Sequence, residues 1–425
     1  MPMTLNIFSK ITVAGFFFLI AFITLISNRI CAQNKSLDFF VSAAMKSSPL
    51  LNDFRNQASS NLIDSLRIRA SYKPQVAGTS INSYSPVING WGYDNAVTNG
   101  ANISALVGLN QKLVSKQNLQ NQYETIRLQN EGLNVTGKIS EQDLKKTITS
   151  QYITAYGVSQ QFAYNNEMLS LLKKEEIILK QLAEKGIYRQ TDYLTFLVTI
   201  QQQELQIGQI RLQYQNEYAL LNYLSGMVDT SFVLLTAPLI DSNEIPALEN
   251  TVFYEQFVVD SMKLRNNDAQ IDFNYKPKVS LYADAGYLSS LMYLPYKNFG
   301  TSVGVNVAVP IYDGHQKKMQ HDKISIAEQT RRQYRDFFKT QHDQQIAQLH
   351  QQLQSAEQLI AQATGQLRFA QALIDANRKL LETGDARIAD YIIAIGNFIT
   401  ARNSITQNTI SRLQIINQLN YWNRK

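Results

Sequence analysis

The stretch KGIYRQTDYL, residues 185–194, returns at an offset of 198 positions as TGDARIADYI, residues 383–392. Four pairs of residues keep the same register: Gly186 with Gly384, Arg189 with Arg387, Asp192 with Asp390, and Tyr193 with Tyr391. A fixed offset between matching segments is the sequence signature of an internal repeat. The two stretches therefore indicate that the chain contains one structural unit twice.

The duplication extends well beyond these ten residues. At the offset of 198, NYL at 222–224 aligns with NYW at 420–422. Upstream, YKPQV at 72–76 matches YKPKV at 275–279 at an offset of 203. We predict two tandem repeats, residues 33–236 and 251–425, joined by a linker at 237–250.

The N-terminus has the pattern of an export signal. Lys10 precedes an uncharged apolar run at 11–27, and the small residue Ala32 provides a cleavage position. We predict that residues 1–32 are a cleaved signal peptide. One alternative is a retained membrane anchor, although the run is short of the roughly 20 residues that a span needs. Another is lipidation of Cys31, which the bulky residues before it disfavour.

The composition and the motifs exclude several classes of function. The net charge of +6 is spread along the 425 residues, without the clustered basic face that nucleic-acid binding needs. The chain has no phosphate loop and no nucleophile elbow. Its four histidines, which show no HExxH spacing, are His315, His321, His342 and His350. We therefore predict no enzyme, no catalytic or cofactor-binding residues, no cofactor and no metal site.

Each repeat is expected to contain a helix, two strands, a very long helix, a turn and a shorter helix. Tracts rich in Gln, Asn and Ala, with few prolines and glycines, favour long helices with polar faces. We expect the pre-strand helices at 37–71 and about 253–274, the strands at about 75–87, 101–112, 278–290 and 300–312, the long helices at about 113–185 and 316–383, and the tips near 186–193 and 384–391. The second pre-strand helix is the shorter one, which leaves the symmetry of the two repeats in question.

The last predicted strand has the clearest alternation. In GTSVGVNVAVPIYDG, Val303, Val305 and Val307 face one way, and Gly304 and Asn306 face the other. A half-buried soluble hairpin and a membrane strand both give this pattern. In a membrane, four strands leave open edges that lipid does not tolerate, so two or more chains would have to share one barrel. The residues expected to face its lumen are Tyr282, Asp284 and Asn306.

Together, the signal, the duplicated unit, the YKP before the strands, the VAVPIYDG after them and the G-x5-D-Y turn resemble the TolC-like outer membrane efflux proteins. The resemblance implies a mainly α fold with a membrane β-barrel part. It implies a homotrimer whose twelve-stranded barrel in outer-membrane lipid continues as a periplasmic α-helical coiled-coil tunnel. It further implies an exit duct for efflux or type I secretion that works with a periplasmic adaptor protein and an inner-membrane pump.

In this family the turns form the periplasmic tips, so the resemblance makes the eight matched residues candidates for a tip or gate. The residues themselves supply simpler reasons: glycine adopts left-handed backbone readily, and an aspartate at a helix start can cap free N–H groups. Arg387 and Asp390 are expected to make tip contacts between protomers. Because Ile393 stands where some members carry a second acidic residue, any acidic ring would have one layer.

A second reading remains open from the sequence. The same helices and strands are compatible with an exported structural coiled coil, or with a periplasmic adaptor, that does not conduct. The nature of the substrate, and the choice between efflux and protein secretion, also stay open.

Overall fold

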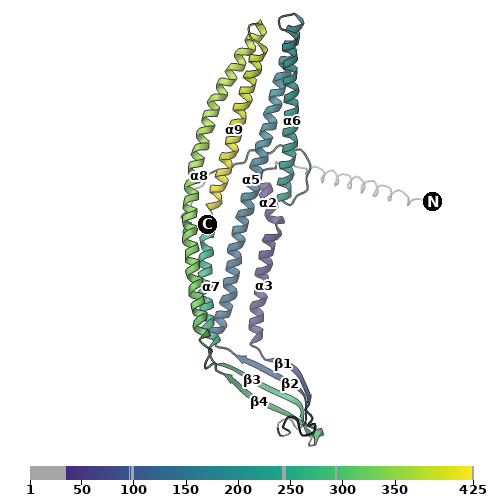
Figure 1. The fold of residues 1–425 in the computed structure, drawn as a ribbon, viewed down its shortest axis with the longest axis vertical. Helices are drawn as coiled ribbons and strands as arrows, with labels where there is room; N and C mark the ends of the chain where they lie inside the picture. Colours follow the sequence, from purple (N-terminus) through teal and green to yellow (C-terminus); the bar gives the residue numbers. More distant parts are fainter. Residues whose placement is uncertain (1–34, 95, 97–99, 242–245, 292–293, 424–425) are drawn as a thin grey trace, which may run out of the picture. The chain divides into compact units, whose positions relative to one another are not determined.

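The computed structural model describes residues 35–94, 96, 100–241, 246–291 and 294–423, so the predicted signal peptide lies outside the described residues. The elements follow one another in the expected order (Figure 1). The first half contains α2 (Leu37–Ser47), α3 (Pro49–Ser71), β1 (Gln75–Tyr84), β2 (Ala101–Leu113), α5 (Lys116–Glu184) and α6 (Gln190–Leu224). The second contains α7 (Val252–Asn274), β3 (Lys278–Ser289), β4 (Phe299–Ala308), α8 (Gln316–Thr383) and α9 (Ile388–Trp422), with short 3-10 turns at Leu248–Asn250 and Pro295–Lys297.

The helix expected at 37–71 is in fact two helices, because the chain breaks at Ser48. The Ser48 side chain accepts a hydrogen bond from the Leu51 N–H (3.4 Å), and Pro49 occupies the first helical position. Serine at the cap and proline just inside it are typical of a helix start. The shorter helix expected in the second half is explained by this break: α7 has 23 residues, as does α3, and the described residues before α7 hold no counterpart of α2.

The other boundaries differ from expectation by a few residues. α8 begins and ends at the predicted positions, and α5 begins three residues later than predicted. β4 ends at Ala308, four residues early, and Pro310 follows it. Proline has no N–H for the ladder and restricts the residue before it, which favours an early end to the strand. The element order agrees with the predicted duplication, which itself stays a prediction.

The described chain packs as two compact units, each built from three separate stretches. The tip unit, named for its two helical turns, comprises the described residues of Met1–Ser47, Lys145–Asp241 and Leu353–Asn417. The sheet unit comprises those of Ser48–Leu144, Ser242–Gln352 and Gln418–Lys425. Both units therefore draw on both halves of the sequence.

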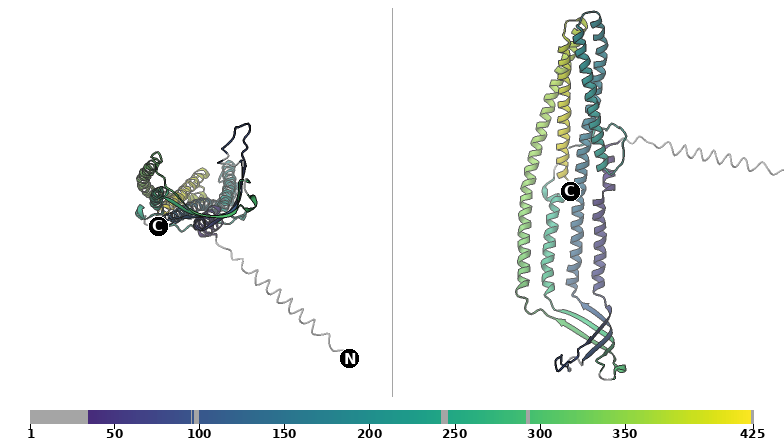
Figure 2. Two further views of the ribbon diagram at one scale, coloured as in Figure 1. Left: turned by 90° about the horizontal axis from the view of Figure 1, so that it is seen from below. Right: turned by 45° about the vertical axis from the view of Figure 1, so that its right-hand side comes forward.

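In the sheet unit, four antiparallel strands pair in the order β1-β2-β3-β4 and form a curved sheet (Figure 2). Lys112, Ser280 and Asn306 lie directly opposite one another across β2, β3 and β4. Directly opposite residues share a face. One face of β2, β3 and β4 is consequently mainly apolar, with Val107, Leu109, Leu281, Val303, Val305 and Val307, and the other is mainly polar, with Asn110, Lys112, Ser280, Tyr282, Asp284, Ser302 and Asn306. The exceptions include Gln111 on the first face and Leu106 on the second.

The helices of the sheet unit enclose a small aromatic core. Val135, Val252, Phe253 and Val259 are buried, and the side chains of Phe338 and Trp422 pack against them. Among the helices of the described ranges, none combines the length and the apolar character that a membrane span requires.

In the tip unit, the larger core lies among α5, α6, α8 and α9. Its fully buried members include Leu172, Leu179, Phe196, Tyr391 and Ala394. Leu172 and Leu179 are seven positions apart, and Tyr391 and Ala394 are three apart, which are spacings with which long helices bury a common seam. The core therefore holds together the ends of four helices, where the two turns of the repeated motif lie (Figure 1).

Candidate functional site: the paired turns of the tip unit

The two repeated turns have the same backbone geometry. Gly186 has φ 75° and Gly384 has φ 81°, the left-handed conformation that was predicted for both. In the first turn the Ile187 N–H donates to the Leu182 carbonyl, 3.0 Å away. The second turn repeats this bond with the Asp385 N–H as donor to the carbonyl five residues back, at 2.8 Å. Both long helices thus end in a Schellman motif, which explains the glycine at each turn.

The arginines, and not the aspartates, occupy the cap positions. Arg189 is the N-cap of α6 and makes no side-chain capping hydrogen bond, while Asp192 lies in the first turn of the helix. In the second turn Arg387 immediately precedes α9, and its Nε and Nη2 donate to Asp390 at 3.1 and 3.2 Å. The expectation that Asp390 caps the helix was therefore wrong in detail, because its carboxylate accepts from the arginine side chain. Both aspartates still lie near the positive end of a helix dipole.

The two tyrosines of the motif differ in their environment. Tyr193 is half-buried, whereas Tyr391 is completely buried and stacks on Phe196 with ring centroids 6.5 Å apart. Burial raises the pKa of Tyr391, and its hydroxyl has no hydrogen-bond partner in the described structure. Tyr391 is therefore a core residue that supports the turn, and is not available as a surface contact.

Tyr188, which the sequence did not single out, connects the two turns. Its hydroxyl lies 3.0 Å from the Leu381 carbonyl and 2.9 Å from the Ala386 carbonyl, so it donates to either of them. The turns also touch directly, because Ile187 Cγ2 would lie 3.0 Å from a Cβ on Gly384. The residue aligned with Tyr188 in the second copy is Ala386, which has no hydroxyl group. The second turn therefore makes no equivalent side-chain hydrogen bond to the first from this position. The site is consequently a single structure made by two segments that are far apart in sequence.

An ion pair between a buried carboxylate and a partly exposed arginine lies beneath the turns. Arg378 Nε of α8 is 2.9 Å from Glu175 Oε1 of α5, and the Glu175 side chain is only 3% exposed. Burial raises the pKa of Glu175, while the charge of Arg378 opposes that rise. A signal for this pair existed in the sequence, since Glu175 stands among the apolar residues Met168, Leu172 and Leu179 at core spacing.

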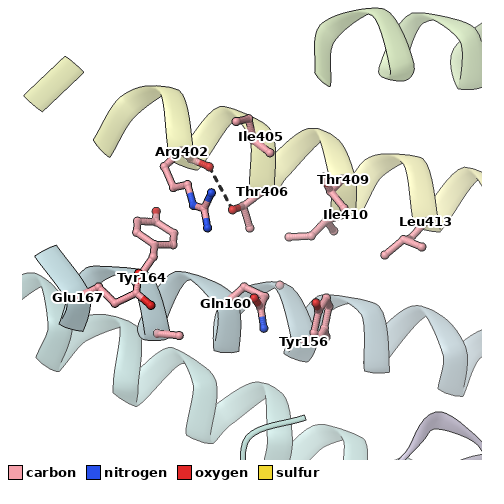
Figure 3. A pocket seen from close by; sticks show the side chains of 12 residues that line it. Tyr156, Gln160, Tyr164, Glu167, Arg402, Ile405, Thr406, Thr409, Ile410 and Leu413 are labelled. Carbon is pink, nitrogen blue, oxygen red and sulfur yellow. Dashed lines mark hydrogen bonds between the residues drawn. The ribbon is translucent and has the colours of Figure 1, made fainter. Parts of the chain in front are cut away.

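A separate pocket lies between α5 and α9 in the tip unit, with a volume of about 230 Å³. Figure 3 shows Tyr164 of α5 and Arg402 of α9 reaching into it from opposite walls. Close packing of the two helices accompanies it, because Ile410 lies where a side chain on Gly157 would stand. None of the residues predicted from the repeated motif lines this pocket.

The residues predicted for the lumen lie in the sheet unit. Tyr282, Asp284 and Asn306 share the polar face of the sheet, and Asp284 accepts a hydrogen bond from the Ser302 hydroxyl at 2.6 Å.

His321, one of the four histidines, has two acidic neighbours: its Nδ1 lies 2.6 Å from Asp268 Oδ1, and its Nε2 lies 3.5 Å from Asp272 Oδ1. Over the described ranges, no group of three or more His, Cys, Asp or Glu residues is arranged to hold a metal ion.

Solved structures with the same fold come from bacterial membrane channels. CusC, described for its transmembrane channel formation, superposes with a TM-score of 0.73 at 14% identity, covering 92% of this chain and 93% of that one. The outer membrane protein VceC from Vibrio cholerae has a TM-score of 0.69 at 12% identity, with coverages of 91% and 96%. The open state of the Neisseria gonorrhoeae MtrE outer membrane channel gives 0.69 at 12%, with 91% and 88%. Neither a scan against protein-family models nor a search of the curated proteins found a match.

This chain therefore has the fold that is seen in these membrane channel proteins. More particularly, it is the TolC-like fold that the doubled turn and the strand-to-helix motif indicated, and the resemblance found in the sequence is confirmed at the level of the fold.

Proposed function

We propose that this protein is the outer-membrane exit duct of a tripartite efflux or type I secretion system. The observation that carries the proposal is the fold itself, because over nine-tenths of the chain superposes on channels that span an outer membrane. In this role the duct accepts substrates from an inner-membrane pump through a periplasmic adaptor, and nucleic acid is not a partner.

The sheet supports a membrane location. Val303, Val305 and Val307 are 82%, 62% and 57% exposed and stand together on the apolar face. The opposite face carries Asp284, Ser302 and Asn306. Membrane barrels have an apolar outer surface and a polar interior, so the apolar face would contact lipid and the polar face would line the lumen.

The open edges of the sheet support a trimer. β1 and β4 each pair on one side only, which leaves two rows of unpaired backbone groups. Unpaired backbone groups are not tolerated in lipid, and barrels need at least about eight strands. Three chains with four strands each would close a twelve-stranded barrel. Such a ring leaves no edge exposed.

The helices of the tip unit carry stripes of exposed apolar side chains. On α6, the exposed side chains Leu194, Val198, Leu205 and Leu212 follow spacings of four and seven residues. On α8, Leu373 and Leu380 are 43% and 46% exposed and also lie seven residues apart. Apolar residues at this spacing normally form a seam with another helix. In a trimer, neighbouring protomers would cover these stripes and complete a periplasmic tunnel.

A charge placed on each face of β4 tests the membrane location. Val305→Arg puts arginine on the apolar face and Asn306→Arg puts it on the polar face, one residue away. At mid-membrane, arginine on the lipid side costs about 2–4 kcal/mol, whereas lumen positions tolerate charge. We expect V305R to abolish the heat-modifiable trimer in outer-membrane fractions and N306R to retain it. An exported coiled coil that stays in water would accept both substitutions equally, which would overturn the proposal.

A further inference from the structure

The sheet unit contains a basic cavity of about 580 Å³ that the proposed function does not use. It lies where β2, β3 and β4 meet the first turns of α5 and the end of α7. Lys112, Lys276 and Lys278 all line it, and none of its lining residues is an aspartate or a glutamate. Amide and hydroxyl groups complete the wall, including those of Asn118, Gln122, Asn274, Ser280 and Asn306.

These three lysines carry charge that no carboxylate within the described chain balances. No salt bridge joins any of them to an acidic side chain among the described residues, and Lys276 instead lies over the Phe273 ring, 4.5 Å from its centroid. The carboxylate of Asp272, from the same part of α7, is already engaged by Lys317 at 2.8 Å. The cavity is therefore a concentration of unpaired positive charge.

A second nearby carboxylate is also occupied. Asp313 accepts hydrogen bonds from the backbone N–H groups of His315 at 2.9 Å and Lys317 at 2.7 Å. Its role is to cap the start of α8, as an aspartate before a helix commonly does. Neither Asp272 nor Asp313 is thus free to neutralise the cavity.

The strand register places this charge on the polar face of the sheet. Lys112, Ser280 and Asn306 are direct cross-strand partners, and Lys278 lies two residues before Ser280 on the same strand. Residues two apart on a strand share a face. The lysines of β2 and β3 therefore point away from the apolar valines, toward the side that would line the lumen.

We propose that this cavity binds anions that carry phosphate groups. Lysine ammonium groups attract phosphate as point charges, and Asn and Gln amides add hydrogen-bond donors in fixed positions. A concave wall of one sign also focuses its potential and raises the local concentration of anions. The site belongs to a single chain; its position in the lumen, where three copies would form a ring of positive charge, rests on the proposed function.

The site is tested by isothermal titration calorimetry, in which inorganic pyrophosphate is titrated into the purified full-length protein in detergent and the heat of binding is measured. Losing two charged donors in Lys112→Gln with Lys278→Gln is expected to weaken binding by about tenfold or more. The charge-preserving pair Lys112→Arg with Lys278→Arg should retain binding. A control removes two exposed lysines outside the cavity, Lys46→Gln with Lys297→Gln, and should bind like the unaltered protein. The proposal is overturned if the K112Q/K278Q pair binds pyrophosphate as tightly as the unaltered protein. It is also overturned if the control pair loses as much affinity as the K112Q/K278Q pair.

Two sources of phosphate are separated by repeating the titration in nanodiscs. We expect pyrophosphate to bind equally in phosphatidylcholine and in phosphatidylglycerol, because the polar face is turned away from lipid. If phosphatidylglycerol abolishes binding, a lipid headgroup fills the cavity and the lumen placement is overturned.

Channel recordings distinguish this proposal from the proposed function. In a KCl gradient the K112Q/K278Q pair should shift the reversal potential toward cation selectivity. The cavity alone would be refuted if the unaltered protein forms channels but binds no pyrophosphate, and if the K112Q/K278Q pair has the same reversal potential as the unaltered protein. Pyrophosphate binding that depends on Lys112 and Lys278, in a protein that forms no channels, would support the cavity and refute the proposed function.

Discussion

Arg387 donates from both Nε and Nη2 to the carboxylate of Asp390 in its own chain, at 3.1 and 3.2 Å. The pair is exposed, with 84% of the arginine side chain and 41% of the aspartate side chain accessible. Exposed pairs three residues apart on a helix contribute at most about 0.5 kcal/mol. Exchange of this contact for one with a neighbouring protomer would thus cost little, which suits residues at a gate.

Removal of this pair tests the second turn as the gate. In the double variant Arg387→Ala with Asp390→Ala we expect a higher single-channel conductance, because contacts between tips are lost. The matched control is Arg189→Ala with Asp192→Ala in the first turn, at the aligned positions. It should leave conductance unchanged. Conductance that is the same for all three proteins would contradict a gate at Arg387 and Asp390.

The turn glycine is tested by a pair of alanine substitutions. Gly186 has φ 75° with open space around it, so Gly186→Ala introduces backbone strain without a clash. We expect a loss of about 1–2 kcal/mol and a lower melting temperature of the helical circular dichroism signal. Gly208 lies within α6 and also has open space where a Cβ would stand, so Gly208→Ala should stabilise the protein by about 0.5–1 kcal/mol. Shifts of the same sign for both variants would contradict this explanation of the turn.

The Tyr188 hydroxyl is expected to hold the two turns together. Tyr188→Phe removes the donor to the Leu381 and Ala386 carbonyls and keeps the ring. The expected loss is about 1 kcal/mol, together with faster amide exchange at residues 383–387. The control is Tyr193→Phe, which removes the hydroxyl of a half-buried tyrosine that takes no part in the hydrogen bonds of Tyr188. Equal exchange rates in Y188F and the unaltered protein would exclude this role.

The Glu175–Arg378 pair predicts a pH dependence of stability. The folded state raises the pKa of Glu175, so folding favours the protonated carboxyl group over the carboxylate. The stability that this preference contributes is present below the ordinary pKa of 4.5 and is lost as pH rises through the raised pKa of the folded state. Glu175→Gln removes this loss of stability, because glutamine cannot ionise. We expect E175Q to melt at or above the temperature of the unaltered protein at pH 8, with the difference shrinking toward pH 4.5.

The partner substitution has the opposite sign. Arg378→Ala leaves the buried carboxylate without its cation, so we expect a loss of about 1–3 kcal/mol at pH 8. This loss should decrease as the carboxyl group becomes protonated at lower pH. If E175Q is as damaging as R378A at pH 8, the pair is a net source of stability and the assigned direction of the Glu175 pKa is wrong.

Features that depend on local chemistry were predictable from the sequence. The absence of proline across 113–185 and 316–383 allowed the two long helices, and the doubled glycine gave both turns and their left-handed backbone. The break at Ser48 was also present in the sequence as a serine–proline start signal, but the apolar periodicity that continues across it concealed it. Local patterns thus recovered most elements, with errors at their ends.

Features that depend on contacts between distant segments were not predictable in this way. The Tyr188 hydroxyl and the Leu381 carbonyl are 193 positions apart, and nothing in the residues near Tyr188 names that acceptor. The complete burial of Tyr391 likewise depends on Phe196 from another helix. For the same reason the repeat could align Tyr193 with Tyr391 and still not show that only one of them is a core residue.

The central claim, that this chain forms a conducting duct, is tested most directly by single-channel recording from the purified protein in a planar lipid bilayer. We predict discrete conductance steps from a trimeric species, with larger steps when Arg387 and Asp390 are both replaced by alanine. A homogeneous, folded trimer that inserts into the bilayer and gives no steps, even with both residues replaced, would contradict the account.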